Sequence, residues 1–351
     1  MRASASRFGS KHATNLIAPG LLILAAVIAC HGSFGVPFFF DDSIAVTNNP
    51  SIRELRRIGQ VLSPPADGGG VTGRPIVNLS LALSYALSGT DVRDYHVFNL
   101  LVHASSALAL FGLVRRTLLQ STLRRRYGSA AALLAFNIAL LWTVHPLQTE
   151  SVTCVIQRTE LLVGIFYLLT LYCFVRSTDH NASWRWPILA IASCALGMAS
   201  KEVMVSAPLM VLLYDRTFVA GTFRAAWQQR RGLYAGLAST WLILAGLLAE
   251  IGGTRGEAAG FGLGVTWWSY ALKQCEAIVT YLTLSFWPQP LIIDYGTEVI
   301  TDPMRVAPQI LVVLHLIAGM IIALRWRPAL GFLMFWVCAI LAPSSSVVPL
   351  I

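Results

Sequence analysis

Two adjacent carboxylates, Asp41 and Asp42, follow three phenylalanines at the end of the first long apolar run. Like-charge repulsion and desolvation near hydrocarbon raise the pKa of one member of such a pair. A carboxylate of this kind suits a general base, and the pair also suits a divalent cation. The alternative is that both are solvated acids that end a helix. We predict that Asp41 and Asp42 are catalytic, with a divalent cation as a possible cofactor.

Three cations stand at the edges of other apolar runs. Arg74 precedes Pro75, Arg158 lies within VIQRTELL, and Lys201 forms a two-residue turn with Glu202. Charged residues at the edge of hydrocarbon are often functional, and Arg and Lys are the side chains that bind phosphate. Snorkelling or a salt bridge is the alternative for each. Together the three predict a phosphate-binding site.

Four further residues are predicted to support this chemistry: His145, Glu150, Glu160 and Glu202. The three glutamates lie within two residues of a cation or beside the His145 segment. Pairing with a cation lowers the pKa of a carboxylate and makes it a poorer base. We therefore expect these residues to orient the reacting groups rather than to accept the proton.

Two observations narrow the chemistry. His96, Asn99 and His103 recur at i, i+3 and i+7, so they share one helix face, which is expected to pack on other helices. The chain carries no P-loop, GxGxxG, HExxH or nucleophile-elbow motif. ATP-driven transport and hydrolase chemistry lose support accordingly.

The composition indicates a membrane protein. Of 351 residues, 56% are hydrophobic and only 12% are charged, whereas a soluble domain carries about 25% charged residues. The net charge of +9 fits basic loops held at an anionic leaflet better than a nucleic-acid surface, so no nucleic-acid partner is expected. The six cysteines are scattered, without the spacing of a metal site or a disulfide framework.

The apolar runs predict a polytopic bundle whose two faces differ in charge. Spans are expected at about 15–37, 96–114, 129–144, 155–175, 187–199, 203–214, 233–250, 305–324 and 329–342. The stretch 266–286 is ambiguous, and we expect it to lie in the interface or to re-enter. The inner loops then hold 16 Lys and Arg against two acids, and the outer segments hold 10 against 15. The basic face is predicted to be cytoplasmic.

The outer face is predicted to consist of two helical segments, at about 38–95 and 251–304. Within the first, 51–62 has the spacing of an amphipathic helix, and 75–87 is apolar but too short to span. We expect residues 1–351 to form a single transmembrane domain. The chain ends on PSSSVVPLI directly after a span, which suggests a truncated reading frame.

Seven short motifs occur in a fixed order along the chain. They are FFFDDSIAVTNNPSI, GRPIVNLSLALSYAL, HVFNLLVHASSAL, VHPLQTESVTCVIQRTELL, ASKEVMVSAPLMVLLYD, FWPQPLIIDYG and LAPSSSVVPL. Together they resemble the membrane part of the transmembrane-and-tetratricopeptide-repeat O-mannosyltransferases and their bacterial relatives. That family belongs to the C-type glycosyltransferase superfamily, which implies an all-α, polytopic transmembrane helical bundle with helical outer loops.

The resemblance implies transfer of a mannose-like sugar from a polyprenyl-phosphate donor to an acceptor hydroxyl on the non-cytoplasmic face. The acceptor would be a protein or a glycan, and the membrane a bacterial inner membrane or the endoplasmic reticulum. Asp41 and Asp42 match the family's acidic pair in the first outer loop, where a base or metal ligand is expected. His145, Glu150, Arg158 and Glu160 match the family's HP-x-x-T-E and R-x-E-L stretch. Lys201 and Glu202 match the family's K-E pair.

The resemblance also has a limit. Family members continue past the Ser-rich segment with an E-x-R-x-Y-L-P-like motif, further spans and tetratricopeptide repeats, which this sequence does not contain. Two other functions stay open. A secondary transporter would place ionisable residues near mid-membrane and show a repeat between its halves, and neither is evident. The other open function is that of an inactive membrane scaffold or fragment.

Overall fold

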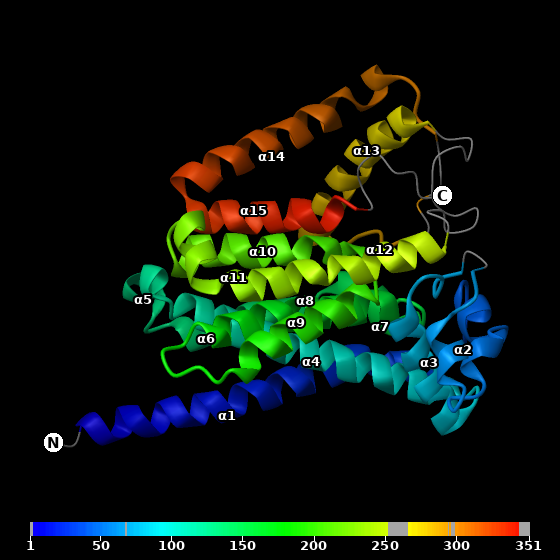
Figure 1. Ribbon diagram of the computed structural model, residues 1–351, viewed down its shortest axis with the longest axis horizontal. Helices are drawn as coiled ribbons and strands as arrows, with labels where there is room; N and C mark the ends of the chain where they lie inside the picture. Colours follow the sequence, from blue (N-terminus) through cyan, green and yellow to red (C-terminus); the bar gives the residue numbers. More distant parts are fainter. Residues whose placement is uncertain (1–2, 67–68, 252–265, 294, 296–298, 344–351) are drawn as a thin grey trace.

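The computed structural model of the chain describes residues 3–66, 69–251, 266–293, 295 and 299–343 (Figure 1). All regular structure in these residues is helical, as the apolar runs predict. The longer helices are α1 (Ala3–Cys30), α4 (Val92–Leu118), α6 (Ala131–Thr143), α8 (Arg158–Ser177), α9 (Arg185–Met198), α11 (Phe223–Ser239), α12 (Trp241–Glu250), α13 (Trp267–Phe286), α14 (Ala307–Trp326) and α15 (Pro328–Leu341).

Five stretches of the described chain are long and apolar enough to cross a membrane. They are Ile17–Gly35, Val92–Leu118, Arg158–Ser177, Phe223–Glu250 and Pro303–Trp326. A sixth results if α6 and Pro146–Thr153, which meet at 55°, form one bent span. The protein is therefore a multi-pass membrane protein.

Three of the nine predicted spans correspond to shorter helices. These are α9 and α15, with 14 residues each, and α10 (Ala207–Tyr214), with eight. Fourteen residues of α-helix extend about 21 Å, less than the roughly 30 Å of a hydrocarbon core. The three run alongside the longer helices (Figure 1), and α9 packs directly on α8. They complete the bundle without each being a full span by itself.

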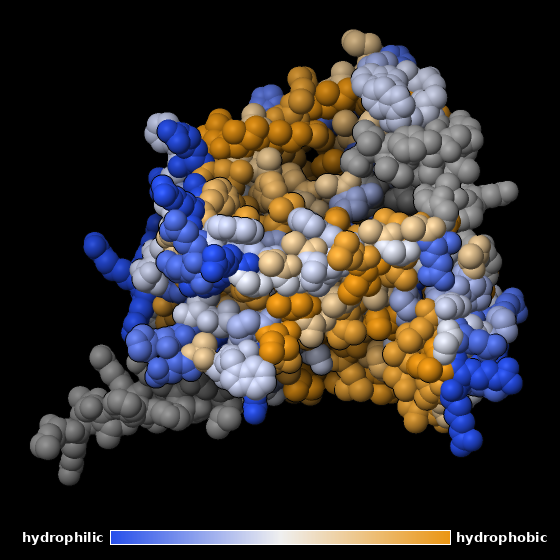
Figure 2. Space-filling view, viewed as in Figure 1, coloured by the Kyte–Doolittle hydropathy of each residue, from blue (hydrophilic) through white to orange (hydrophobic). Residues whose placement is uncertain are grey.

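The helices run roughly parallel, so the bundle has two ends (Figure 1). We call the end that carries α5 (Ser121–Tyr127) the basic end. The opposite end, with α2 (Ile58–Leu62), α3 (Pro75–Ser88) and α7 (Thr149–Thr153), is the acidic end. Polar residues gather at both ends and an apolar belt separates them (Figure 2). This is the pattern expected of a bundle that crosses a bilayer.

Helix α13 differs in composition from the candidate spans. It carries Lys273 and Glu276, which form an ion pair of 2.9 Å, and it is not among the five apolar stretches. Because α12 ends and α14 begins at the acidic end (Figure 1), the chain between them returns to the end from which it started. That 266–286 lies in the interface or re-enters stays a prediction. The second outer segment is described only in part, since 252–265, 294 and 296–298 lie outside the described residues.

The first outer segment packs on the bundle through its own apolar core. Val46, Val77, Leu81 and Tyr95 are fully buried there, together with Val155 at the entry to α8. Proline is well placed at the start of α3, because the first helical position needs no backbone N–H donor. The core therefore holds residues 45–62 and helix α3 against the ends of α4 and α8.

One helix in this segment is shorter than predicted. The pattern over 51–62 indicates a single amphipathic helix, but the structure has a 3₁₀ turn at Pro50–Ile52, bends and turns at 53–57, and helix α2 at Ile58–Leu62. Ile52 and Val61 are buried, whereas Ile58 is half exposed. Arg53 donates to the carbonyl of Val46, so tertiary contacts replace the continuous helix.

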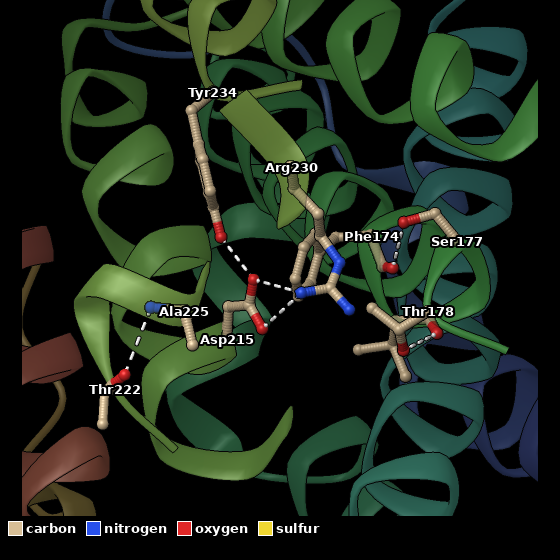
Figure 3. Close-up of polar contacts among 9 residues, drawn as sticks. Phe174, Ser177, Thr178, Asp215, Thr222, Ala225, Arg230 and Tyr234 are labelled. Atoms are coloured by element: carbon tan, nitrogen blue, oxygen red, sulfur yellow. Dashed lines mark hydrogen bonds and ion pairs between the residues drawn. The ribbon is translucent and has the colours of Figure 1, made fainter. Parts of the chain in front are cut away.

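At the basic end, both acids are paired with arginine. Asp179 lies 2.9 Å from Arg116. Asp215 is fully buried, and Figure 3 shows Arg230 and Tyr234 converging on its carboxylate, with Arg230 at 2.9 and 3.1 Å. Arg230 has a non-helical backbone conformation within α11, so the kink aims its guanidinium at Asp215. Neither acid adds an unpaired negative charge to the basic end.

Candidate active site

The two predicted catalytic carboxylates point in different directions. Asp42 is fully buried, and its carboxylate accepts backbone N–H bonds from Ile156 at 2.7 Å and from Val155 and Phe39 at 3.3 Å. The Cys154 thiol lies 3.6 Å from the same carboxylate. Burial raises the pKa of Asp42, while the backbone hydrogen bonds oppose that rise. Its oxygens are occupied by the chain that enters α8, so Asp42 fixes that loop.

Asp41 is exposed and lines a cleft at the acidic end. The preceding residue, Phe40, has φ of +52°, a left-handed conformation that is uncommon for a side chain of this size. Such outliers cluster at functional sites because the surrounding structure must hold them. Here the conformation occurs at the turn that directs Asp42 inward and leaves Asp41 at the cleft.

The cleft beside Asp41 has a volume of about 490 Å³. Asp41 and Glu150 are the carboxylates in its described lining, and Tyr281, Tyr295 and Gln157 add further polar groups. Most of the remaining lining is apolar: Phe39, Phe40, Pro146, Leu147, Ile156, Leu284, Leu291, Ile292 and Ile293. A mostly apolar pocket with a few convergent polar groups is the usual form of a small-molecule or lipid site.

His145 and Glu150 hold parts of this cleft together. His145 Nδ1 accepts the backbone N–H of Leu147 at 3.3 Å, which leaves Nε2 to donate to the Ser285 carbonyl at 3.2 Å. This links the corner after α6 to the end of α13. Glu150 accepts a 3.0 Å hydrogen bond from Gln157 and remains exposed. The supporting role of both residues stays a prediction.

Arg158 is placed differently from the prediction. Its side chain is fully buried, and its guanidinium donates to Asn99 at 2.8 Å, to the Ser80 carbonyl at 2.9 Å and to the Tyr95 carbonyl at 3.0 Å. It also lies 4.3 Å from the centre of the Phe98 ring. These partners come from α3 and α4. Because the guanidinium is enclosed and satisfied, in this structure Arg158 joins helices and does not face a ligand.

Lys201 lies in a second cleft, of about 460 Å³. It forms an ion pair with Glu160, and both line this cleft with the aromatic residues Trp142, Tyr167 and Trp336. Tyr281 lines the Lys201 cleft as well as the Asp41 cleft. The two clefts are therefore neighbours: Asp41 and Glu150 line the first, the Lys201–Glu160 pair lines the second, and Tyr281 lines both.

Arg74 and Glu202 form a looser pair near the start of α3. Their closest side-chain atoms are 3.7 Å apart, and both side chains are largely buried. Arg74 also donates to the Gly70 carbonyl at 2.8 Å. Glu202 follows Lys201 directly in the turn after α9. This turn therefore carries one predicted cation, Lys201, and contacts a second, Arg74, through Glu202.

The shared helix face of His96, Asn99 and His103 packs inside the protein, as predicted. His96 bonds to the Val36 carbonyl at 2.9 Å, His103 to the Thr143 carbonyl at 3.0 Å, and Asn99 to Arg158. Within the described residues, no three His, Cys, Asp or Glu side chains lie close enough to hold a metal ion. The divalent cation stays a prediction.

Tyr281 is the site residue that sequence reasoning missed. Nothing in the spacing of the sequence connects Tyr281, within the ambiguous stretch 266–286, to the residues near 41 and 201. The FWPQPLIIDYG motif was the available signal, since its residues Leu291, Ile292, Ile293 and Tyr295 line the Asp41 cleft. Within this motif, Asp294 lies outside the described residues.

Comparison with known proteins finds protein O-mannosyl-transferases among the relatives of this chain. The human protein O-mannosyl-transferase TMTC4 is 30% identical over 58% of this chain and 30% of its own length. The Drosophila melanogaster protein O-mannosyl-transferase Tmtc1 is 27% identical over 75% of this chain and 32% of its own. A Caenorhabditis elegans protein O-mannosyl-transferase is 26% identical over 55% of this chain and 27% of its own length. The chain thus spans about a third or less of these relatives.

A family model extends the comparison to the site. The model described as dolichyl-phosphate-mannose-protein mannosyltransferase matches residues 73–248, half of the 351 residues. The match includes Arg74, Glu150 and Lys201, whereas Asp41 precedes it. No solved structure matches the chain. The extent of this match shows that the chain belongs to the dolichyl-phosphate-mannose-protein mannosyltransferase family.

Proposed function

We propose that this chain transfers mannose from a polyprenyl-phosphate donor, of the dolichyl-phosphate type, to an acceptor hydroxyl at the acidic end of the bundle. One observation carries the proposal. The exposed Asp41 and the cation Lys201 line neighbouring clefts that share Tyr281. The first cleft supplies a base for an acceptor, and the second a positive charge for a phosphate. Membership of the mannosyltransferase family supplies the donor class.

The reaction needs one proton acceptor and one stabilised leaving group. The acceptor oxygen forms a bond to C1 of mannose while the bond from C1 to the phosphate oxygen breaks. The hydroxyl proton passes to the Asp41 carboxylate, and the polyprenyl phosphate leaves with the electron pair of the broken bond. A positioned base contributes about 10²–10⁴-fold to such a step. Asp41 is preferred to Asp42 because only Asp41 is exposed to the cleft.

Lys201 and Arg74 are the proposed phosphate ligands. Both are held by glutamates, Lys201 by Glu160 and Arg74 by Glu202, and a phosphate carries enough charge to bind either cation in place of a carboxylate. The aromatic and aliphatic walls of the Lys201 cleft, including Trp336 and Ile340, offer an apolar surface for the isoprenoid chain. Arg158 is assigned to positioning, since it fixes the start of α8.

The acidic end is proposed to face away from the cytoplasm. The support is the distribution of Lys and Arg, which gather in the short loops of the opposite end. The acceptor is proposed to be a protein, after the printed names of the family and its relatives. An inactive scaffold is the competing proposal, which the activity test below decides.

The test follows transfer of labelled mannose from dolichyl-phosphate mannose to membrane protein, catalysed by the full chain in lipid vesicles. Asp41→Asn should reduce turnover about 10²–10⁴-fold, with photo-crosslinking to a donor analogue unchanged. Glu150→Gln, in the same cleft, is the matched control and should lose much less. Near-normal turnover in Asp41→Asn with loss in Glu150→Gln would move the base to Glu150. Donor crosslinking without any transfer by the unmodified chain would favour the scaffold.

A further inference from the structure

A third pocket, with a more polar lining, opens at the basic end, across the bundle from the Asp41 and Lys201 clefts. It has a volume of about 550 Å³ and lies between the last turns of α4 and α8. Its charged lining consists of Arg115, Arg116, Arg176 and Asp179. Three cations and one carboxylate leave a net charge of +2. We call this the arginine pocket.

The single carboxylate is shared by two of the arginines. Asp179 Oδ2 lies 2.9 Å from Arg116 Nη1 and 3.8 Å from Arg176 Nε. That Nε is buried and lacks a hydrogen-bond partner within the described chain. Arg115 lines the pocket with a guanidinium that makes no hydrogen bond, ion pair or ring contact to any described residue. The pocket therefore holds more positive charge than its own acid neutralises.

Aromatic rings hold two of these cations in place. Arg176 lies 4.3 Å from the centre of the Trp186 ring, and Arg116 lies 5.8 Å from that of Tyr172. Tyr172 itself lines the pocket and packs closely over Gly112, where an added Cβ would come within 2.8 Å of its ring. Stacking of this kind reduces the freedom of an arginine side chain before a ligand arrives.

Helix dipoles explain part of this arrangement. The carbonyl ends of α4 and α8 attract cations, so arginines in the last turns are favourable without any ligand. That effect does not account for a concave opening of this size, nor for its graded wall. Along α4 the lining residues recur on one face, and they change from apolar Leu108 and Phe111 to charged Arg115. Seven residues of helix separate Leu108 from Arg115, about 10 Å.

This gradient fits an amphiphile better than a soluble anion. A phosphate would meet the guanidinium groups at the mouth, while an attached acyl chain would extend past Leu108 toward the apolar belt seen in Figure 2. A soluble anion would have no use for the apolar part of the wall. Anionic lipids are also enriched in the leaflet that basic loops contact.

We propose that the arginine pocket binds the headgroup of an anionic phospholipid, through charge-assisted hydrogen bonds from Arg115 and Arg176 to the phosphate. This site is separate from the proposed transferase site and does not depend on it. Asp179 lies closer to Arg116, at 2.9 Å, than to Arg176, at 3.8 Å, so Arg115 and Arg176 carry most of the affinity.

The experiment titrates the purified full chain, in a neutral detergent, with dihexanoylphosphatidylglycerol, dihexanoylphosphatidylcholine and inorganic phosphate. Phosphatidylglycerol should bind at least about tenfold more tightly than the other two ligands. Arg115→Gln/Arg176→Gln should weaken its binding about 10- to 30-fold, at roughly a factor of five per arginine near the surface. Arg124→Gln/Arg125→Gln removes the same charge from exposed residues of α5, and it should change the affinity less than about twofold.

Three results would overturn the proposal. If both double variants weaken phosphatidylglycerol binding equally, the binding depends on general surface charge and not on the arginine pocket. Equal binding of phosphatidylcholine would remove the charge recognition, and phosphate as tight as phosphatidylglycerol would make the ligand a soluble anion. If Arg115→Gln/Arg176→Gln does not fold, Arg115→Gln replaces it, since this change removes no hydrogen bond, ion pair or ring contact within the described chain. An affinity within about twofold of the unmodified chain would then refute the assignment.

Discussion

Asp42 Oδ1 accepts a 2.7 Å hydrogen bond from the Ile156 backbone N–H, across 114 residues of sequence. Asp41, its neighbour, is exposed at a cleft instead. The two adjacent carboxylates are therefore suited to different roles. A carboxylate whose oxygens are occupied by backbone N–H groups holds a loop, whereas an exposed one beside an apolar cleft is free to meet a substrate.

The first prediction separates these two roles. Asp42→Asn should destabilise the protein by about 1–3 kcal/mol, because the amide cannot accept every hydrogen bond and leaves a buried N–H without a partner. Asp41→Asn should leave the thermal midpoint in detergent unchanged and abolish most of the mannosyl transfer. Differential scanning fluorimetry and the transfer assay measure the two effects. A stability loss in Asp41→Asn equal to that in Asp42→Asn would contradict this division.

The second prediction concerns Cys154. Burial and the nearby Asp42 carboxylate raise the pKa of Cys154 to about 12. Because the thiolate is the reactive form, alkylation should be slow at pH 7 and rise about tenfold per pH unit, without a plateau below pH 9. Asp42→Asn removes the negative charge, so it should lower that pKa and speed the reaction. Iodoacetamide kinetics on a chain with Cys154 as its only cysteine measure both rates.

The matched comparison for Cys154 is the same chain after unfolding in detergent, where the thiol should react at the rate of a free cysteine. A folded-state rate that levels off near pH 8.5 would show an ordinary thiol. Slower alkylation in Asp42→Asn would show that the carboxylate does not act on Cys154 through its charge.

The third prediction is that Arg158 is structural. Arg158→Lys keeps the charge but loses the planar fork that reaches Ser80, Asn99 and Tyr95. We expect destabilisation of about 2–4 kcal/mol, since hydrogen bonds to a charged donor are worth about 1.5–3 kcal/mol each. Thermal unfolding measures it, and the KM for the donor of the folded fraction should be unchanged. A raised donor KM with normal stability would return Arg158 to the phosphate site.

The fourth prediction tests the second cleft. Lys201→Met should raise the KM for the polyprenyl-phosphate donor about tenfold or more, since a charge-assisted contact to phosphate is lost. Lys201→Arg keeps the charge and should retain much of the affinity. Glu160→Gln frees Lys201 from its ion pair and should not weaken donor binding. An unchanged donor KM in Lys201→Met would exclude this cleft as the phosphate site.

The fifth prediction concerns orientation. A single cysteine at position 120, in the loop beside α5, should react with a membrane-impermeant maleimide only from the cytoplasmic side. A cysteine at position 41 should react only from the opposite side, and the two serve as controls for each other. Outside-only reaction at position 120 would reverse the topology and place the proposed active site in the cytoplasm.

The sequence by itself determined the class of the molecule. Apolar runs that alternate with charge-sorted loops require a polytopic helical bundle, because only helices satisfy the backbone of such runs in a bilayer. The order of the motifs indicated the mannosyltransferase family, which the family match over 73–248 supports. Both conclusions rest on patterns that are local in the chain and need no knowledge of packing.

Only the tertiary structure decided what each charged residue does. From the sequence, Asp41 and Asp42 look equivalent, and Arg158 is grouped with Lys201. The type of a residue does not reveal its exposure or the groups that it contacts. Folding buries Asp42 against the amides at 155 and 156 and Arg158 among α3 and α4. It also brings Tyr281 between Asp41 and Lys201. Contacts over 60 to 240 residues depend on how the helices pack, which no short-range pattern encodes.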